Sequence, residues 1–136
     1  MARYTALIDG KAGAYGVIFP DLPGCTAMGK SIDQALVNAM AAMRDWVEVT
    51  LEAGEALPAP RPVEILREEV EVRRALREGS TIASVPLIRE KGRPTKANLS
   101  LDSNLLEAID AEAKRLALTR SAFVEMIVRH SLPQLA

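Results

Sequence analysis

The stretch TKANLSLD, residues 95–102, alternates apolar and polar side chains and predicts a β-strand. Its two faces consist of the apolar Ala97, Leu99 and Leu101 and the polar Lys96, Asn98 and Ser100. Only helical sequence follows, whereas a strand needs hydrogen-bonding partners for its backbone and cover for its apolar face. We therefore expect the neighbouring strand to come from a second copy of the chain.

Two helices are predicted after this strand. Asp102 or Ser103 caps the first, and Thr119 is a good N-cap for the second, which should end before Pro133. Strand, helix and helix together span about 40 residues, fewer than usually fold alone. Pairing of two copies would enclose both strands and four helices in one shared core. The side chains that we expect in this dimer core are Leu99, Leu101, Ile109, Phe123 and Ile127.

The strand and the two helices after it resemble a ribbon-helix-helix DNA-binding domain, and the resemblance implies that the outward polar side chains of a two-stranded ribbon read base edges of DNA. A two-stranded ribbon fits the major groove of DNA. There lysine donates hydrogen bonds to guanine, asparagine forms two hydrogen bonds with adenine, and serine can hydrogen-bond to either base. Lys96, Asn98 and Ser100 are therefore the expected base-reading residues. The N-terminus of the last helix attracts phosphate through its free amides and its dipole. The expected phosphate-binding residues are Arg93, Thr119, Arg120 and Ser121.

The segment KANLSLDSNLLEAIDAEAKRLALTRSAFVEMIV, from Lys96 to Val128, resembles a ribbon-helix-helix DNA-binding domain. The resemblance implies a homodimer whose ribbon reads operator DNA, and it leaves the choice between dimers and tetramers open. Members of that family often carry arginine at the third reading position, where this chain has Ser100. The alternative interpretation is an ordinary edge strand whose polar face is merely solvated.

Charge is distributed unevenly along the 136 residues. Residues 1–88 carry nine Lys and Arg against twelve Asp and Glu, whereas residues 89–136 carry eight against six. A short basic arm that leads into an alternating strand indicates nucleic-acid binding better than the overall charge of −1 does. We place one domain at residues 1–88, a linker at 89–94 and a second domain at 95–136.

Four strands are predicted in the N-terminal half. RYTALI (residues 3–8) and YGVIF (15–19) have the pattern of a hairpin, and CTAMGK (25–30) that of a short third strand. TIASVPL (81–87) predicts a fourth strand, which Pro86 places at or near a sheet edge.

Two helices are expected between the third and fourth strands. Ser31 and Gln34 form a capping box, and the apolar stripe behind them predicts a helix that ends near Gly54. Residues 62–78 predict a single polar helix, because their charged side chains recur at helical spacing.

The segments YTALI and YGVIFPDLPGCTAMGKSIDQALVNAMAAM resemble the antitoxin component of HicAB toxin–antitoxin systems. The resemblance implies an α+β protein with a partial ribonuclease-H-like β-β-β-α-β domain before the ribbon-helix-helix domain. It also implies an antitoxin that masks a small mRNA-cleaving toxin of the HicA type and represses its own operon. A toxin that binds RNA should be basic, so the acidic balance of residues 1–88 fits such a partner. The toxin contacts expected in the PDLPG loop are Asp21, Leu22 and Pro23.

Catalysis and metal binding are disfavoured. Asp9, Asp21 and Asp33 are carboxylates of the kind that metal-dependent nucleases use, but turn and helix-start roles fit Asp9 and Asp33 better. His130 is the only histidine, and no second ligand lies near it in the sequence. We therefore expect no enzymatic activity, no cofactor and no metal.

A single cysteine, Cys25, excludes an intrachain disulfide and fits a reducing cytoplasm. No apolar run approaches the ~20 residues of a membrane helix, so we expect a cytoplasmic protein without a membrane partner. The competing interpretation of the chain is a ribbon-helix-helix repressor whose N-terminal domain senses a small ligand and binds no toxin.

Overall fold

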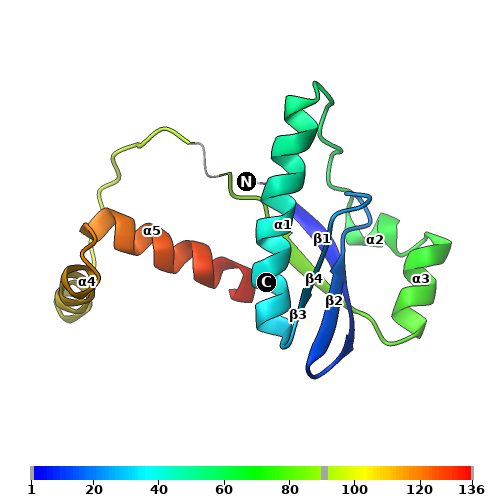
Figure 1. The fold of residues 1–136 in the computed structure, drawn as a ribbon, viewed down its shortest axis with the longest axis horizontal. Helices are drawn as coiled ribbons and strands as arrows, with labels where there is room; N and C mark the ends of the chain where they lie inside the picture. Colours follow the sequence, from blue (N-terminus) through cyan, green and yellow to red (C-terminus); the bar gives the residue numbers. More distant parts are fainter. Residues whose placement is uncertain (1, 90–91, 136) are drawn as a thin grey trace. The chain divides into compact units, whose positions relative to one another are not determined.

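The computed structural model describes residues 2–89 and 92–135, and the chain divides into two compact units (Figure 1). Unit 1 comprises residues 1–90 together with 133–136, and unit 2 comprises residues 91–132.

One antiparallel sheet of four strands, in the order β3-β2-β1-β4, forms the centre of unit 1. The strand β1 (Arg3–Lys11) pairs on one side with β2 (Ala14–Ile18), which in turn pairs with β3 (Thr26–Gly29). On its other side β1 pairs with β4 (Thr81–Pro86), so the last strand of the unit lies beside the first. The four predicted strands are confirmed, and Pro86 ends an edge strand as expected.

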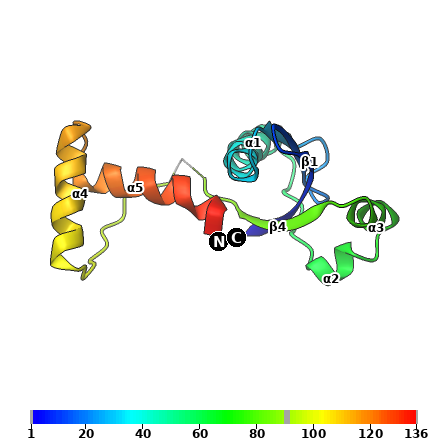
Figure 2. The same ribbon diagram turned by 90° about the horizontal axis from the view of Figure 1, so that it is seen from below.

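The helix α1 (Ile32–Glu52) covers one face of this sheet (Figure 2). Its N-cap is Ser31, whose Oγ accepts a hydrogen bond from the amide of Gln34 at 3.1 Å, as predicted. The reciprocal half of the capping box is absent, because the Gln34 side chain donates to Asn38 instead. One turn of the helix is thus stabilised by a side-chain pair that the sequence pattern did not predict.

The main core lies between α1 and the sheet, where Tyr4, Ala6 and Ile8 alternate along β1 and meet the apolar stripe of the helix. Gly29 permits the close approach of β3 to α1. A Cβ atom at this position would lie 2.4 Å from the amide nitrogen of Ala35. Only glycine fits there without moving backbone.

The single helix predicted over residues 62–78 is wrong. The structure has two short helices, α2 (Val63–Leu66) and α3 (Val70–Arg77), separated by a turn. Glu69 takes an extended conformation there, and its carboxylate pairs with Arg61. Leu66 and Val72 are both buried although they lie outside the main core cluster, so burial of these two side chains accompanies the break. The helix α2 lies on the side of the sheet opposite α1 (Figure 2).

Unit 2 contains α4 (Ser103–Arg115) and α5 (Arg120–Ser131), and a short 3-10 helix (Leu132–Leu135) follows them in the chain. Both predicted caps are confirmed. The side chain of Asp102 accepts hydrogen bonds from the amides of Asn104 and Leu105, and the side chain of Thr119 accepts one from the amide of Ala122. Residues 92–102 have no regular secondary structure in the single chain. The ribbon strand expected at 96–101 therefore stays a prediction, since its pairing requires a second copy.

The connection between α4 and α5 contains a residue in the left-handed region. Ala117 has a φ of 57°, and its neighbour Leu118 donates its amide to the carbonyl of Ala113 at 2.8 Å. This hydrogen bond closes the end of α4 in the way that usually places glycine at the left-handed position. Among the described residues, no helix is both long and apolar enough to cross a membrane.

Candidate functional site

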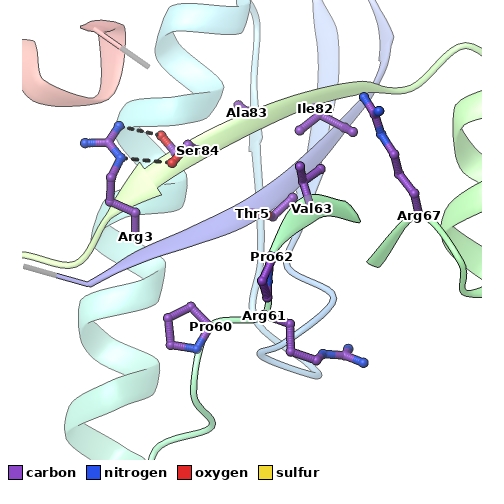
Figure 3. Close-up of a pocket in the computed structure, with 10 residues that line it drawn as sticks. All are labelled: Arg3, Thr5, Pro60, Arg61, Pro62, Val63, Arg67, Ile82, Ala83 and Ser84. Atoms are coloured by element: carbon purple, nitrogen blue, oxygen red, sulfur yellow. Dashed lines mark hydrogen bonds between the residues drawn. The ribbon is translucent and has the colours of Figure 1, made fainter. Parts of the chain in front are cut away.

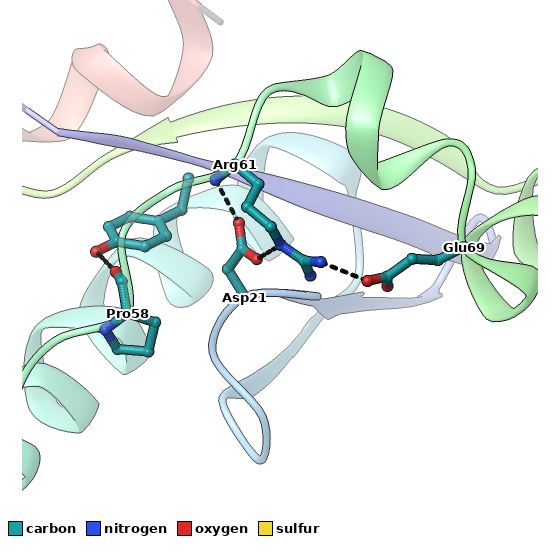
Figure 4. Close-up of polar contacts among 5 residues, drawn as sticks. Asp21, Pro58, Arg61 and Glu69 are labelled. Carbon is teal, nitrogen blue, oxygen red and sulfur yellow. Dashed lines mark hydrogen bonds and ion pairs between the residues drawn. The ribbon is translucent and has the colours of Figure 1, made fainter.

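The PDLPG loop is fixed from inside the protein by Asp21, which is only 6% exposed. Its Oδ2 accepts the backbone N–H of Arg61 at 2.8 Å, and its Oδ1 accepts the guanidinium Nε at 2.6 Å (Figure 4). Arg61 also pairs with Glu69 at 2.5 Å. The hydrogen bonds that the guanidinium donates to Asp21 and Glu69 raise the pKa of Arg61 above its usual range. The carboxylate therefore joins the loop to the segment between α1 and α2.

A second hydrogen bond fixes the same segment. The hydroxyl of Tyr4 donates to the carbonyl oxygen of Pro58 at 2.7 Å. Burial and the nearby charge of Asp21 raise the pKa of Tyr4, so the hydroxyl keeps its proton. The proline-rich stretch before α2 is thus anchored to β1 by Tyr4 and to the PDLPG loop by Asp21.

Leu22, the centre of the loop, is fully buried in the main core. Its amide donates to Phe19 and its carbonyl accepts the amide of Cys25, so the loop closes on itself. Burial of Asp21 and Leu22 differs from the expectation that both contact a partner, and Pro23 alone of the three is exposed. Local sequence patterns do not indicate this burial, because Arg61 lies 40 residues further along the chain.

A groove of about 340 Å³ lies beside Pro23, between the end of the loop and α1. The indole Nε1 of Trp46 donates to the carbonyl oxygen of Pro23 at 3.1 Å and fixes the ring in the wall of this groove. Asp45 and Val49 belong to the same wall, and the sequence pattern assigned neither of them a role. The remaining lining residues are Gly24, Cys25, Thr26 and Ala42.

A second groove, of about 480 Å³, lies against β1 and β4 (Figure 3). Its charged residues are three arginines, Arg3, Arg61 and Arg67. The guanidinium of Arg3 donates to the hydroxyl and the carbonyl of Ser84, at 2.9 Å and 3.0 Å, which orients it along the strand (Figure 3). These two grooves therefore differ in the sign of the charged side chains that line them.

The expected DNA-binding residues of unit 2 fall into two groups. Arg93, Lys96, Asn98 and Ser100 are all exposed, in the segment without regular structure. The other three stand at the N-terminus of α5, namely Thr119, Arg120 and Ser121. Arg120 is engaged within the unit, because its Nε and Nη2 donate to the two oxygens of Asp110 at 2.7 Å and 2.8 Å. These bonds lower the pKa of Asp110.

The expected dimer core is largely uncovered in the single chain. Leu99 is 71% exposed, Leu101 42% and Ile127 44%, whereas Ile109 and Phe123 are half-buried where α4 packs on α5. Further apolar side chains of unit 2 with substantial exposure are Leu105, Leu116, Leu118, Met126 and Val128.

The sequence matches the model of the HicB-like antitoxin of bacterial toxin–antitoxin systems over residues 4–128. The chain belongs to this HicB-like antitoxin family. Two relatives resemble it in sequence. A 14.9 kDa protein of the rep-hol intergenic region of Haemophilus phage HP1 (strain HP1c1) is 31% identical over 107 residues, 79% of this chain and 78% of the relative. The UPF0150 protein Ta0767 of Thermoplasma acidophilum is 36% identical over 64 residues, 46% of this chain and 93% of the relative.

Solved structures of HicB antitoxins are similar to the chain, two of them over nearly its whole length. The Burkholderia pseudomallei antitoxin HicB is 28% identical, with a TM-score of 0.53, and the match covers 98% of each chain. The antitoxin HicB3 is also 28% identical, with a TM-score of 0.54, and the match covers 96% of this chain and 97% of that one. A chain of a HicA3–HicB3 complex shares the fold of 63% of this chain at 23% identity and a TM-score of 0.53, covering 98% of that chain.

The HicB-like chain has no group of three or more His, Cys, Asp or Glu side chains arranged to hold a metal ion within residues 2–89 and 92–135. Burial raises the pKa of the Cys25 thiol to about 11, so the thiol is protonated and has a packing role at neutral pH. The HicB-like protein therefore has two candidate surfaces. The first is the PDLPG loop with the groove beside it in unit 1, and the second is the exposed segment with Arg93, Lys96, Asn98 and Ser100 in unit 2.

Proposed function

We propose that this HicB-like protein neutralises a HicA-type, mRNA-cleaving toxin through unit 1 and represses its own operon through unit 2. Family membership over residues 4–128 carries the first half of the proposal. The likeness to the Burkholderia pseudomallei antitoxin along the whole chain supports it. The acidic balance of residues 1–88 suits a basic partner that binds RNA, because complementary charge speeds and orients association. Unit 1 would act by covering the RNA-binding or catalytic surface of the toxin.

The exposed apolar side chains of unit 2 support the second half of the proposal. Leu99, Leu101 and Ile127 are all more than 40% exposed in the single chain. Soluble proteins rarely leave a contiguous apolar surface uncovered, so these residues suit an interface with a second copy. In the ribbon-helix-helix arrangement that we propose, the strands at 96–101 of two copies pair and four helices close over them. For unit 1 we keep the proposal of a partial ribonuclease-H-like domain. The chain order β1, β2, β3, α1 and β4, with α2 and α3 inserted before β4, supports it.

The ribbon would place Lys96, Asn98 and Ser100 on its outer face, in the major groove. The first amides of α5, at Arg120 and Ser121, have no partner within the helix by geometry and would receive a backbone phosphate. Arg120 would have to exchange Asp110 for a phosphate oxygen, so we assign it a weaker role than its backbone amide.

The experiment that tests the division of labour compares the full chain with a fragment that ends at residue 90. The probes are the small protein encoded by the adjoining reading frame and the DNA upstream of the operon. We expect both forms to bind the small protein and to restore growth of cells that produce it, and only the full chain to bind the DNA. A fragment that lost the small protein would refute the assignment of toxin binding to unit 1. If the full chain bound the DNA but did not bind the small protein, a ligand-sensing repressor would be the better interpretation.

A further inference from the structure

The groove between α1 and the PDLPG loop has an acidic and an aromatic residue side by side in the chain. Ala42 and Val49 each lie three or four residues from Asp45 and from Trp46, so the four residues share one face of α1. Val49 is 66% exposed and presents an apolar surface at one end of the groove. This face is therefore mixed, with a carboxylate, an indole and an aliphatic side chain within one groove of about 340 Å³.

The loop makes the groove rigid. Trp46 is tied to the carbonyl of Pro23, and the loop that carries Pro23 is held by the buried Asp21 and Leu22. The indole therefore stands in a fixed orientation before any partner arrives. A preformed wall reduces the entropy that binding must remove.

The charge of the groove determines the class of side chain that it suits. Asp45 is the only charged residue among the described residues that line it, and it is exposed. The larger groove against β1 and β4 is lined by arginines and has the opposite sign. A cation gains from a carboxylate and from the face of an indole, and the aliphatic stem of lysine or arginine packs on apolar surface.

We propose that this groove receives a lysine or arginine side chain of the toxin, with Asp45 as its ion-pair partner and Trp46 as its aromatic wall. Val49 contacts the aliphatic stem of the incoming side chain. This inference rests on the proposed function, because the partner is the basic toxin. It replaces Asp21 and Leu22 as contact residues and keeps Pro23, which stands at the edge of the groove.

The test measures the affinity of full-length variants for the small basic protein encoded by the adjoining reading frame. Asp45→Lys reverses the charge of the groove, and Val49→Arg fills it with a cation from the chain itself. Glu64→Lys is the matched control, because it makes the same change in net charge at an exposed position of α2, outside the groove. All three positions are exposed, and thermal unfolding checks that each variant folds as the parent does.

We expect Asp45→Lys to weaken binding at least tenfold at low salt, with a smaller loss at high salt, and Val49→Arg to weaken it to a similar degree. Glu64→Lys should change affinity less than twofold. Equal losses for Asp45→Lys and Glu64→Lys would overturn the proposal in favour of a general charge effect. Unchanged binding by Asp45→Lys would place the contact elsewhere while the proposed function stands. Failure of the parent chain to bind would instead reject the proposed function itself.

Discussion

Asp21 accepts two hydrogen bonds from Arg61, one from the backbone N–H and one from the guanidinium Nε. Removal of the carboxylate would leave the donors of Arg61 without a partner in a region with little water, and an unpaired buried polar group costs free energy. We expect Asp21→Ala to lower the free energy of unfolding by about 2–3 kcal/mol. Urea unfolding followed by Trp46 fluorescence measures this change. Glu55→Ala, at an exposed position with no side-chain bond in the described chain, is the control and should change stability little. Equal stability of the two variants would contradict a structural role for Asp21.

The Cys25 thiol should be unreactive in the folded protein. Its pKa is raised to about 11 by burial, so the reactive thiolate is scarce at pH 8 and forms only as the pH approaches that value. We expect alkylation by iodoacetamide at pH 8 to require unfolding and to accelerate strongly in denaturant. Mass spectrometry of samples taken over time measures the rate. Rapid labelling of the native chain would show that the thiol is accessible.

Ala117 marks a position where glycine should improve stability. A left-handed conformation costs an L-residue with a Cβ about 1–2 kcal/mol, and glycine avoids most of that cost. We expect Ala117→Gly to stabilise the end of α4 by about 0.5–1 kcal/mol, measured by hydrogen exchange of its amides. Ala108→Gly, in the middle of the same helix, is the matched substitution and should destabilise it by about 1 kcal/mol. Stability changes of opposite sign in the two variants would distinguish relief of backbone strain at residue 117 from a general effect of glycine.

The exposed Leu99 should hold the dimer that we propose. Leu99→Asp would bury a charge in the shared core, so we expect a monomer in analytical ultracentrifugation and no binding to operator DNA. Met28→Asp is a suitable control, because Met28 is 69% exposed in unit 1 and lies outside the proposed interface. A Leu99→Asp variant that stayed dimeric through unit 2 would exclude the ribbon-helix-helix arrangement.

Asn98 should read one base pair in each half-site. Asn98→Ala should cost about 1–3 kcal/mol of discrimination at that position in a binding assay with single-base operator variants. Arg93→Ala is the informative comparison, since loss of a phosphate contact weakens binding to all sequences alike and lowers the salt slope by about 1. An unchanged base preference of the Asn98→Ala variant would show that Asn98 is not a base-reading residue.

The sequence predicted those elements whose signals are local. Ser31, Asp102 and Thr119 cap their helices as expected, because each N-cap needs only an amide two or three residues away. The break between α2 and α3 was missed, since the contact of Glu69 with Arg61 that accompanies it joins residues eight positions apart and outside a common helix. The inward orientation of Asp21 has the same cause at longer range. Spacing in the sequence does not encode either contact.

The candidate site follows the same division. The alternating row at 96–100 could be read directly from the sequence, but its pairing depends on another molecule. Trp46 belongs to the apolar stripe from which the helix ending near Gly54 was predicted. In the structure the indole is half-buried and lines the groove together with Asp45. A groove forms where separate segments of the chain meet. The PDLPG loop could therefore be predicted from the sequence, whereas the groove beside it could not.

The two edges of the sheet in unit 1 have a consequence for how far the protein can assemble. At the β3 edge the carbonyl of Met28 is occupied by the side chain of Asn38, and at the β4 edge the carbonyl of Ser84 is occupied by Arg3. Pro86, which has no amide proton, closes the latter strand. A strand from another molecule would have to displace these side chains before it could extend the ladder. These side-chain contacts disfavour edge-to-edge association of unit 1 with a second sheet.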